Sequence, residues 1–386
     1  MSVGESVDKT VGKSVGTSAP MGATPELGIK DALARACLRQ DLTADEMAAV
    51  VGAIMDGHVT AAQIGALLTA LRMKGEAVDE VVGAARAMRA RMLRVSPTQG
   101  VHPHDGPADP AAVDVCGTGG DGSGSVNVST LAAFIVAGCG VPVAKHGNRA
   151  LSSRAGSHDV IEALGLDPAP PPALAGRCLA EAKLAFLFAP LYHAATKAVA
   201  GPRRELGFRT IFNVLGPLTN PAGVRFAVNG VFAPERCELL ARAHHQLGTE
   251  RAWVVHGTGG LDEIAPAGTT LVAELRDGQV STREISPGDF GLPASDVDGL
   301  KGGEPDLNAR ILREALDGAP GPVRNVSVMT AAAALYVAGA ATNLREGAAQ
   351  AGAALDDGRA RAVLAQLREL APLRPAAPAP TTAAAP

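Results

Sequence analysis

The feature that most constrains this chain is a glycine-rich stretch at residues 114–130, which reads DVCGTGGDGSGSVNVST. An apolar run at 112–116 predicts a short strand before it, and residues 131–137 predict a helix after it. Five glycines and Asp121 lie between, and the stretch ends in Asn127, Ser129 and Thr130. Glycines let backbone N–H groups approach an anion, and a helix N-terminus adds unpaired donors. The layout therefore predicts a phosphate-binding loop.

Two other phosphate loops do not fit this stretch. Residues 117–122 satisfy G-x-G-x-x-G, but the dinucleotide fingerprint also needs an acid about 20 residues further on. Lys145 and His146 stand near that place. No Lys-Ser or Lys-Thr pair follows the glycines, which excludes a P-loop. A glycine-rich turn that binds no ligand is the alternative for this loop considered alone.

Composition narrows the class of protein. The 386 residues are enough for two domains, and 47% of them are apolar, so a large core is expected. A net charge of −4 argues against a general nucleic-acid binder. The first 20 residues have no apolar h-region, and the longest apolar run, 330–341, is too short to span a bilayer. Five scattered cysteines without a C-x-x-C pair favour reduced thiols in a cytoplasmic protein.

The N-terminal part of the chain has the pattern of a small helical domain. Apolar periodicity predicts helices at 29–38, 43–55, 60–75 and 79–93. Thr43-x-x-Glu46 and Thr60-x-x-Gln63 are capping boxes that begin two of them. Short, capped helices with apolar stripes are typical of a compact domain that can present a dimer face.

Beyond a proline-containing linker at 96–111, strands alternate with helices. This pattern predicts an α/β fold with a central, mostly parallel sheet flanked by helices, whose ligand lies at the carboxyl ends of the strands. We expect strands at 112–116, 141–145, 185–189, 226–231 and 252–256, and helices at 131–137, 158–164, 234–247, 327–343 and 358–370. The predicted organisation is a disordered tail at 1–26, a helical domain at 27–98 joined by a helical stretch near 191–215, an α/β domain at 111–370 and a second disordered tail at 371–386.

A second polar segment, KHGNRALSSRAGS at 145–157, also leaves a predicted strand. Its cations and neutral donors suit a multiply charged phosphate ester. They are Lys145, Arg149, Arg154, Asn148, Ser152, Ser153 and Ser157. The alternative is a solvated basic loop, which the neighbouring glycine loop makes less favoured.

A third segment, GTGGLDE at 257–263, places Asp262 and Glu263 beyond another glycine loop at a strand end. Mg²⁺ prefers one or two carboxylates together with phosphate oxygens and water. Ser129 adds a hydroxyl oxygen to the same predicted site. Adjacent acids are also common on protein surfaces, so the assignment depends on a phosphate site at the same sheet edge.

A fourth group of polar residues follows residue 191 in a helical-looking stretch: Tyr192, His193, Lys197, Arg203, Arg204 and Arg209. A guanidinium such as that of Arg203 can hold a carboxylate with two parallel hydrogen bonds. For Lys197 and Arg204 we favour a charged helix surface. The chain has no G-x-S-x-G, no H-E-x-x-H and no Cys-His nucleophile pattern. Phosphate sites without a nucleophile favour a transfer driven by positioning and charge stabilisation, with phosphate as the leaving group.

Several strings, in this order, resemble those of the anthranilate phosphoribosyltransferase family, within the nucleoside phosphorylase and phosphoribosyltransferase fold family. They are GTGGD at 117–121, NVST at 127–130, KHGNR at 145–149, RELG-x-RTIFN-x-LGPLTNP at 204–221 and LDE at 261–263. The resemblance extends over residues 28–370. It implies a pentosyltransferase of tryptophan biosynthesis that acts on phosphoribosyl pyrophosphate (PRPP) and anthranilate, with Mg²⁺, as a homodimer joined through its helical part.

The same resemblance implies site residues. PRPP is expected at Gly117, Gly120, Asp121, Ser125, Asn127, Val128, Ser129, Thr130, Lys145, His146, Gly147, Asn148, Arg149, Ala150, Leu151, Ser152, Ser153 and Ser157. Mg²⁺ is expected at Ser129, Asp262 and Glu263. Anthranilate is expected at Gly117, Asn148 and Arg203, with Tyr192 and His193 near its entry path. No covalent catalytic nucleophile is implied.

The sequence departs from the family pattern in a few places. Residues 193–197 read HAATK where the family often has HPAMK, and Ser125-Val126 replaces Thr-Phe. Arg154-Ala155 replaces Lys-Ser. Two other functions stay open: a pyrimidine nucleoside phosphorylase, whose loop typically carries KHSTGG, and a non-catalytic relative that binds nucleic acid and needs a basic face. The acidic net charge and the intact phosphate and acid motifs favour the transferase.

Overall fold

The protein is described here by a computed structural model, which places residues 1, 27–95, 109, 111–150 and 154–373. Residues 2–26 of the predicted N-terminal tail, most of the linker predicted at 96–111, and Leu151, Ser152 and Ser153 lie outside the described residues. At the other end, residues 371–373 pair with residues 165–167 through backbone hydrogen bonds, and Ala371 is buried. The folded part of the chain therefore extends three residues into the predicted C-terminal tail.

Four N-terminal helices form the helical domain that the sequence predicts. They are α1 (Ile29–Cys37), α2 (Ala44–Met55), α3 (Ala61–Lys74) and α4 (Val78–Arg91). Both predicted capping boxes are present: the Thr43 hydroxyl accepts from Glu46 N, and the Thr60 hydroxyl accepts from Gln63 N. The second helical stretch, α8 (Ala189–Tyr192), α9 (Lys197–Leu206) and α10 (Phe212–Leu215), returns to these helices. Val199 and Phe212 belong to the same hydrophobic core as α2 and α3.

Within the described residues, seven strands form one sheet in the order β3-β2-β1-β4-β5-β6-β7. The strands β1 (Val113–Gly117), β2 (Val143–Gly147), β3 (Leu184–Phe188), β4 (Phe226–Gly230) and β5 (Arg251–Gly257) are parallel. The strands β6 (Thr270–Arg276) and β7 (Gln279–Ile285) extend the sheet as an antiparallel hairpin. The predicted fold class, a small helical domain with a larger, mostly parallel α/β domain, is confirmed, while the hairpin is an addition to it.

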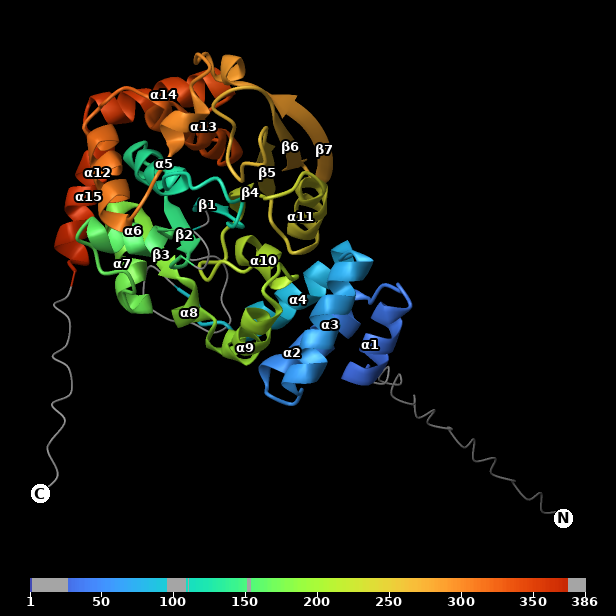
Figure 1. Cartoon of the computed structure of the whole chain (residues 1–386). Helices are drawn as coiled ribbons and strands as arrows, with labels where there is room; N and C mark the ends of the chain where they lie inside the picture. The colour runs from blue at the N-terminus through green and yellow to red at the C-terminus, as the bar shows by residue number, and fades with distance from the viewer. Residues whose placement is uncertain (2–26, 96–108, 110, 151–153, 374–386) are drawn as a thin grey trace, which may run out of the picture.

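Helices cover both faces of the sheet (Figure 1). One face carries α5 (Val128–Gly138) and α13 (Pro322–Val337), and α11 (Glu235–Gln246) and the helical domain lie beyond the other. The side chains of β5 alternate accordingly: Trp253 and Val255 join the first core, and Val254 joins the second. The remaining helices are α6 (Ser157–Ala163), α7 (Pro172–Ala182), α12 (Pro305–Leu316), α14 (Leu344–Asp356) and α15 (Arg359–Leu370).

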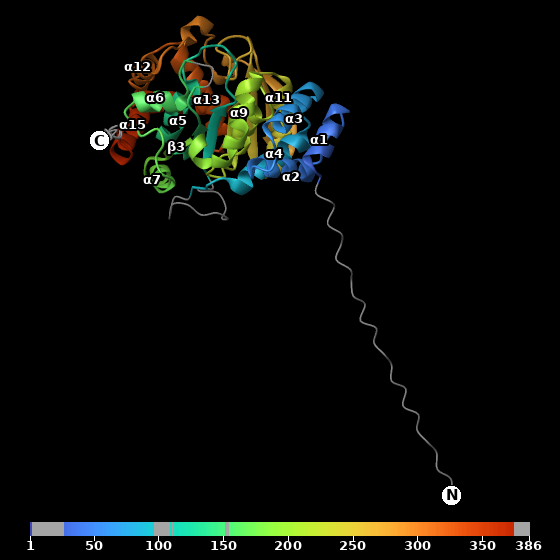
Figure 2. The same ribbon diagram turned by 60° about the horizontal axis from the view of Figure 1, so that its bottom comes forward.

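The molecule is elongated, with α1 and α15 at opposite ends in two views (Figures 1 and 2). The helix α9 lies between the helical domain and the α/β domain in both views. It therefore forms one wall of any cleft between the two. Among the described residues, no helix is both long enough and apolar enough to cross a membrane.

Candidate active site

The glycine-rich stretch forms a loop that begins where β1 ends, at Gly117, and leads into α5. Gly119, Gly120, Gly122 and Gly124 all have positive φ angles between 65° and 78°, which residues with a Cβ rarely adopt. Asp121 stabilises the turn by accepting hydrogen bonds from the backbone N and the hydroxyl of Ser123, at 3.0 and 2.9 Å. The helix begins at Val128, three residues before the predicted start, so Ser129 and Thr130 lie in its first turn.

A second loop, after β5, crosses over the ends of β1 and β4 and carries Asp262. The Asp262 carboxylate accepts a hydrogen bond of 2.7 Å from the backbone N of Gly119. Its backbone N lies 3.4 Å from Asp121 Oδ2. Gly230, the last residue of β4, makes this crossing possible, because a Cβ there would lie 1.5 Å from the Asp262 carbonyl oxygen. Sequence reasoning missed Gly230, whose role depends on a segment about thirty residues further along the chain.

Asp121, Asp262 and Glu263 together form what we call the acidic floor. Burial raises the pKa of Asp262, and the nearby Asp121 charge raises it further. The pKa of Glu263 is also raised, first by burial and then by Asp262. Both shifts have the same physical origin, since carboxylates close together in a poorly hydrated place repel one another. The acidic floor therefore favours a cation.

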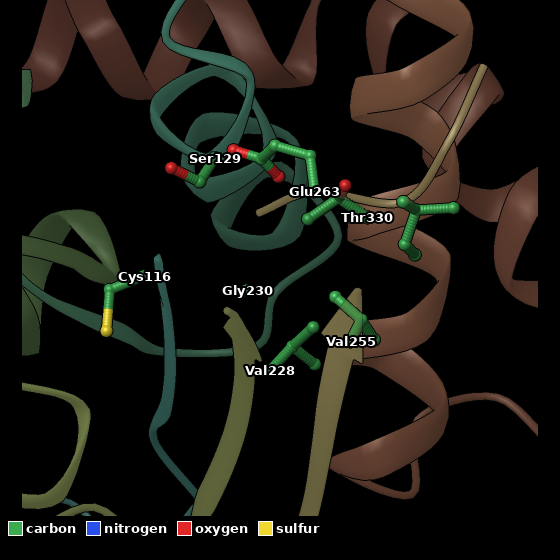
Figure 3. Close-up of a pocket in the computed structure, with 8 residues that line it drawn as sticks. Cys116, Ser129, Val228, Gly230, Val255, Glu263 and Thr330 are labelled. Carbon is green, nitrogen blue, oxygen red and sulfur yellow. The ribbon is translucent and has the colours of Figure 1, made fainter. Parts of the chain in front are cut away.

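Lys145 and Ser129 lie beside Glu263. The Lys145 side chain is buried, and its ammonium donates to the Val115 carbonyl and, at 3.0 Å, to the Ser129 hydroxyl. Ser129 and Glu263 line one small cavity, and Figure 3 shows their oxygen atoms near each other above the ends of β4 and β5. Within the described residues, no group of three His, Cys, Asp or Glu side chains is arranged to hold a metal ion. The oxygens of Ser129, Asp262 and Glu263 fit Mg²⁺ because this ion usually takes only one or two carboxylates from the protein.

A buried polar chain lies beneath the strand ends. Asp114, in β1, is fully buried and accepts hydrogen bonds from Asn220 Nδ2 at 2.8 Å and from the backbone N of His146 at 3.2 Å. On the neighbouring strand, Asn229 Nδ2 donates to the carbonyl oxygen of Cys116, and Asn229 Oδ1 lies 2.8 Å from His244 Nε2. These bonds tie β1, β2, β4 and α11 together directly below the loops.

The segment after β2 divides between the cleft and internal support. Asn148 lines the cleft, whereas Arg149 is held by Asp159 and Glu162 through ion pairs of 2.9 and 2.6 Å. The backbone N of Ala150 donates to Asp159 at 2.9 Å. His146, Gly147 and Ser157 pack behind this segment: the His146 ring bonds the Gly216 carbonyl, and a Cβ on Gly147 would meet the Ser157 hydroxyl at 2.4 Å.

The loops open onto a cleft of about 1320 Å³ between the α/β domain and α9. Of the predicted site residues, Gly120, Asp121, Ser125, Asn148, His193 and Arg203 line it. The segment that contains α9 supplies what we call the cationic wall: Lys197, Arg203 and Arg204 lie on α9, and Arg209 follows it. Tyr192 is 1% exposed, belongs to the hydrophobic core and is not among the described residues that line the cleft. Of the two residues predicted near the entry path, His193 therefore lines the cleft, and Tyr192 lies in the core.

Comparisons with known proteins agree with this geometry. Residues 30–92 match the model of the glycosyl transferase family, helical bundle domain, and residues 109–361 match the model of the glycosyl transferase family, a/b domain. The anthranilate phosphoribosyltransferase of Rhodopseudomonas palustris strain HaA2 is 51% identical over 88% of this chain and 98% of its own length. That of Azorhizobium caulinodans is 53% identical over 84% and 92%. The chain belongs to the anthranilate phosphoribosyltransferase family.

Solved structures of family members have the same fold. The anthranilate phosphoribosyltransferase of Thermus thermophilus superimposes with a TM-score of 0.80 at 42% identity, covering 88% of this chain and 99% of its own. The Saccharomyces cerevisiae enzyme, solved in complex with PRPP and Mg, superimposes with a TM-score of 0.77 at 26% identity, covering 89% and 97%. These relatives support the transferase rather than the nucleoside phosphorylase or the nucleic-acid-binding alternative.

The structure also shows residues of the cleft that sequence reasoning did not select. Lys301, Gly302, Gly303 and Asn308 lie beside the glycine loop, and Gly302 N donates to the Gly124 carbonyl at 2.9 Å. Asn308 is buried, accepts from Gly303 N at 2.7 Å and donates to Asn127 Oδ1 at 3.0 Å. The sequence signal was the pair of glycines before a helix with Pro at its N-terminus. The partner of Asn308 lies 181 residues away, which no local pattern reveals.

Proposed function

We propose that this protein transfers the phosphoribosyl group of PRPP to the amine of anthranilate, giving N-(5-phosphoribosyl)anthranilate and pyrophosphate in tryptophan biosynthesis. The observation that carries the proposal is the convergence of the glycine loop, Lys145 and the acidic floor at one edge of the sheet, where the loop opens onto a cleft that Arg203 also lines. Such an edge, at the carboxyl ends of parallel strands, is where α/β proteins bind phosphorylated ligands. Family membership at 51% identity supports the same reaction.

We assign PRPP to the residues predicted from the sequence around the glycine loop and the segment after β2. Backbone N–H groups of the loop and the first turn of α5 would face the phosphates. Lys145 is too deeply buried for its ammonium to reach far into the cleft. Its role is to place Ser129 and to offset the charge of Glu263. The Lys145 charge reduces the rise in the Glu263 pKa that burial and Asp262 cause.

Mg²⁺ would be held by Ser129, Asp262 and Glu263, with PRPP oxygens and water completing its coordination. When bound, the ion neutralises charge on the departing pyrophosphate. The raised pKa values of the two carboxyl groups support this assignment, because a bound cation would offset the repulsion between the neighbouring carboxylates. The solved yeast relative with PRPP and Mg supports it as well.

In the reaction, the amine lone pair of anthranilate forms a bond to C1 of the ribose while the bond from C1 to the pyrophosphate oxygen breaks. The bonding electrons leave with pyrophosphate, and the positive charge is shared over the ribose ring in the transition state. An aryl amine has low basicity, so its proton is lost late and no general base is needed before attack. Arg203 would hold the anthranilate carboxylate, with Gly117 and Asn148 beside the ring and His193 near the entry.

The direct test follows anthranilate fluorescence during incubation with PRPP and Mg²⁺. We expect the fluorescence to disappear, to persist when a chelator is added, and to disappear again when excess Mg²⁺ is restored. Consumption of thymidine with inorganic phosphate, but not of PRPP with anthranilate, would replace this function by that of a nucleoside phosphorylase.

We also infer a homodimer joined through the helical domain, in the cytoplasm. On that domain Leu38 and Met73 are 70% and 71% exposed, which is unusual for large apolar side chains. No disulfide joins the cysteines of the described residues. Sedimentation of the wild type and of L38E/M73E measures the assembly, and fractionation of the producing cell measures the location.

A further inference from the structure

The cleft contains two kinds of cation. Arg154, Lys197, Arg204 and Lys301 are exposed, and Lys301 is already paired with Asp298 at 2.8 Å. Arg203 and Arg209, by contrast, are half-buried, and each lies against an aromatic ring. Arg203 Cζ is 5.6 Å from the centre of the Phe212 ring, and Arg209 Cζ is 4.1 Å from that of Phe232. Stacking fixes the plane of a guanidinium and leaves its N–H edges free.

Arg209 is the one of these two that lies next to the glycine loop. Its Nε is 3.6 Å from the position that a Cβ would take on Gly120, and its Nη2 is 3.7 Å from it. The segment that carries it turns sharply after α9 at Gly207, which has a φ of 65°. Arg209 is thereby directed away from the acceptor side of the cleft, where Arg203 lies on α9, and toward the phosphate loop.

Arg209 has no anionic partner among the described residues of the protein. The neighbouring carboxylates are engaged elsewhere, since Asp121 accepts from Ser123 and Asp262 accepts from Gly119. A half-buried guanidinium with free N–H edges next to a phosphate loop suits an anion with several oxygens, because it forms two parallel hydrogen bonds.

We propose that Arg209 binds the diphosphate of the sugar donor and stabilises it as the leaving group, a role distinct from that of Arg203 toward the acceptor carboxylate. This inference rests on the proposed function. As the bond from ribose C1 to oxygen breaks, negative charge grows on the departing diphosphate, and a guanidinium fixed in place stabilises this charge without reorganising. Arg209 takes no proton and forms no covalent bond.

The experiment compares R209Q and R209K with the matched control R204Q, which removes an exposed cation from the same wall. Binding of inorganic pyrophosphate with Mg²⁺ is measured by calorimetry, and KM for both substrates and kcat are measured by anthranilate fluorescence. For R209Q we expect about a ten- to hundred-fold loss in pyrophosphate affinity and in kcat/KM for PRPP, with KM for anthranilate within about two-fold of wild type. R209K is expected to recover only part of the loss, because an ammonium cannot donate from a planar fork. R204Q should match the wild type.

Unchanged pyrophosphate affinity in either Arg209 variant would overturn the proposal. An equal loss in R204Q would overturn it too, since the effect would then come from the general field of the wall. If R209Q does not fold, R209K carries the same test. A wild type that binds pyrophosphate but does not consume PRPP with anthranilate would refute the proposed function while leaving the diphosphate site of Arg209 measurable.

Discussion

The acidic floor and the cationic wall both lie next to the glycine loop, yet they are built in opposite ways. Floor residues come from loops at strand ends and are fixed by backbone contacts, as in the 2.7 Å bond from Gly119 N to Asp262. The carboxyl groups of Asp262 and Glu263 are largely buried, and their pKa values are raised. Wall residues are long side chains on α9 and just after it. They are exposed or half-exposed, and two of them are held by aromatic rings.

This difference teaches how the site divides its tasks. The departing diphosphate and a metal ion must be placed within a fraction of an ångström, which strand ends tied by a buried polar chain can do. Recognition of a small acceptor tolerates more motion, so one long side chain of the wall, that of Arg203, suffices for it, whereas Arg209 is directed toward the glycine loop. Substitutions in the floor and in the wall should therefore reduce activity in different ways.

The largest effect is expected from removing the charges of the acidic floor. In D262N/E263Q the side chains keep their shape but no longer attract a cation, so we expect turnover to fall about a thousand-fold. The free energy of unfolding without metal should stay equal or rise at pH 8, because a carboxyl group with a raised pKa destabilises the fold when it is charged. Initial rates across a Mg²⁺ titration and urea unfolding measure the two quantities.

D277A, which removes an exposed acid at the β6–β7 turn, is the control for D262N/E263Q. It should keep full turnover. If the floor variant kept wild-type turnover and the same Mg²⁺ dependence, the metal would have to lie elsewhere.

A substitution in the wall should instead raise the KM of one substrate and leave that of the other nearly unchanged. R203A removes the half-buried guanidinium that we assign to the anthranilate carboxylate, at a cost of about 2–4 kcal/mol. We expect KM for anthranilate to rise by roughly 30-fold or more, with KM for PRPP nearly unchanged. Steady-state kinetics with each substrate varied measures this, and R204A is the matched control. Equal increases in both KM values would remove Arg203 from the acceptor site.

A single methyl group added at Gly230, beneath the floor, should displace the loop that carries Asp262. G230A places a Cβ 1.5 Å from the Asp262 carbonyl oxygen, so the acid loop must move. We expect turnover to fall about a hundred-fold and the Mg²⁺ concentration for half-maximal rate to rise, because the acids lose their positions. G65A is the control, since a Cβ on this residue of α3 meets nothing within 4 Å. If G230A had the wild-type Mg²⁺ dependence, the floor would be more tolerant than the structure indicates.

The same contrast explains what the sequence could predict. Features set by neighbouring residues were predicted well, such as the capping boxes of α2 and α3 and the glycine loop after β1. The hairpin of β6 and β7 was missed although its turn, Asp277-Gly278, is a standard signal and both residues have positive φ. Its alternation of apolar and polar residues is weak because β7 is an exposed edge strand.

The site itself was predicted where residues carry motifs and missed where contacts are distant. Asp262 and Glu263 were found, but not Gly230, which gives the acid loop room. Arg149 has a cationic side chain suited to phosphate, yet it pairs with Asp159 and Glu162, a contact that sequence reasoning did not foresee. Residues of the wall could be identified as cations, but their separate directions depend on the turn at Gly207 and on two aromatic rings from elsewhere.

The smallest expected effect concerns His244, whose ring supports β4 below the floor through Asn229 and also lies 2.9 Å from the Thr249 hydroxyl. Burial, with a smaller contribution from Arg89, lowers its pKa from 6.5 to about 3. Between pH 6.5 and 3 the ring therefore binds a proton in the unfolded chain but not in the folded protein. The contribution of this group to the free energy of unfolding is complete above pH 6.5 and is lost as the pH falls. At pH 5 the loss is about 2 kcal/mol.

H244Q removes this titration, so the difference in unfolding free energy between pH 7.5 and pH 5, measured with urea, should be about 2 kcal/mol smaller than in the wild type. H245Q, at the exposed neighbouring position, should keep the wild-type gap, and equal gaps in all three proteins would mean that the ring beneath the floor accepts a proton after all.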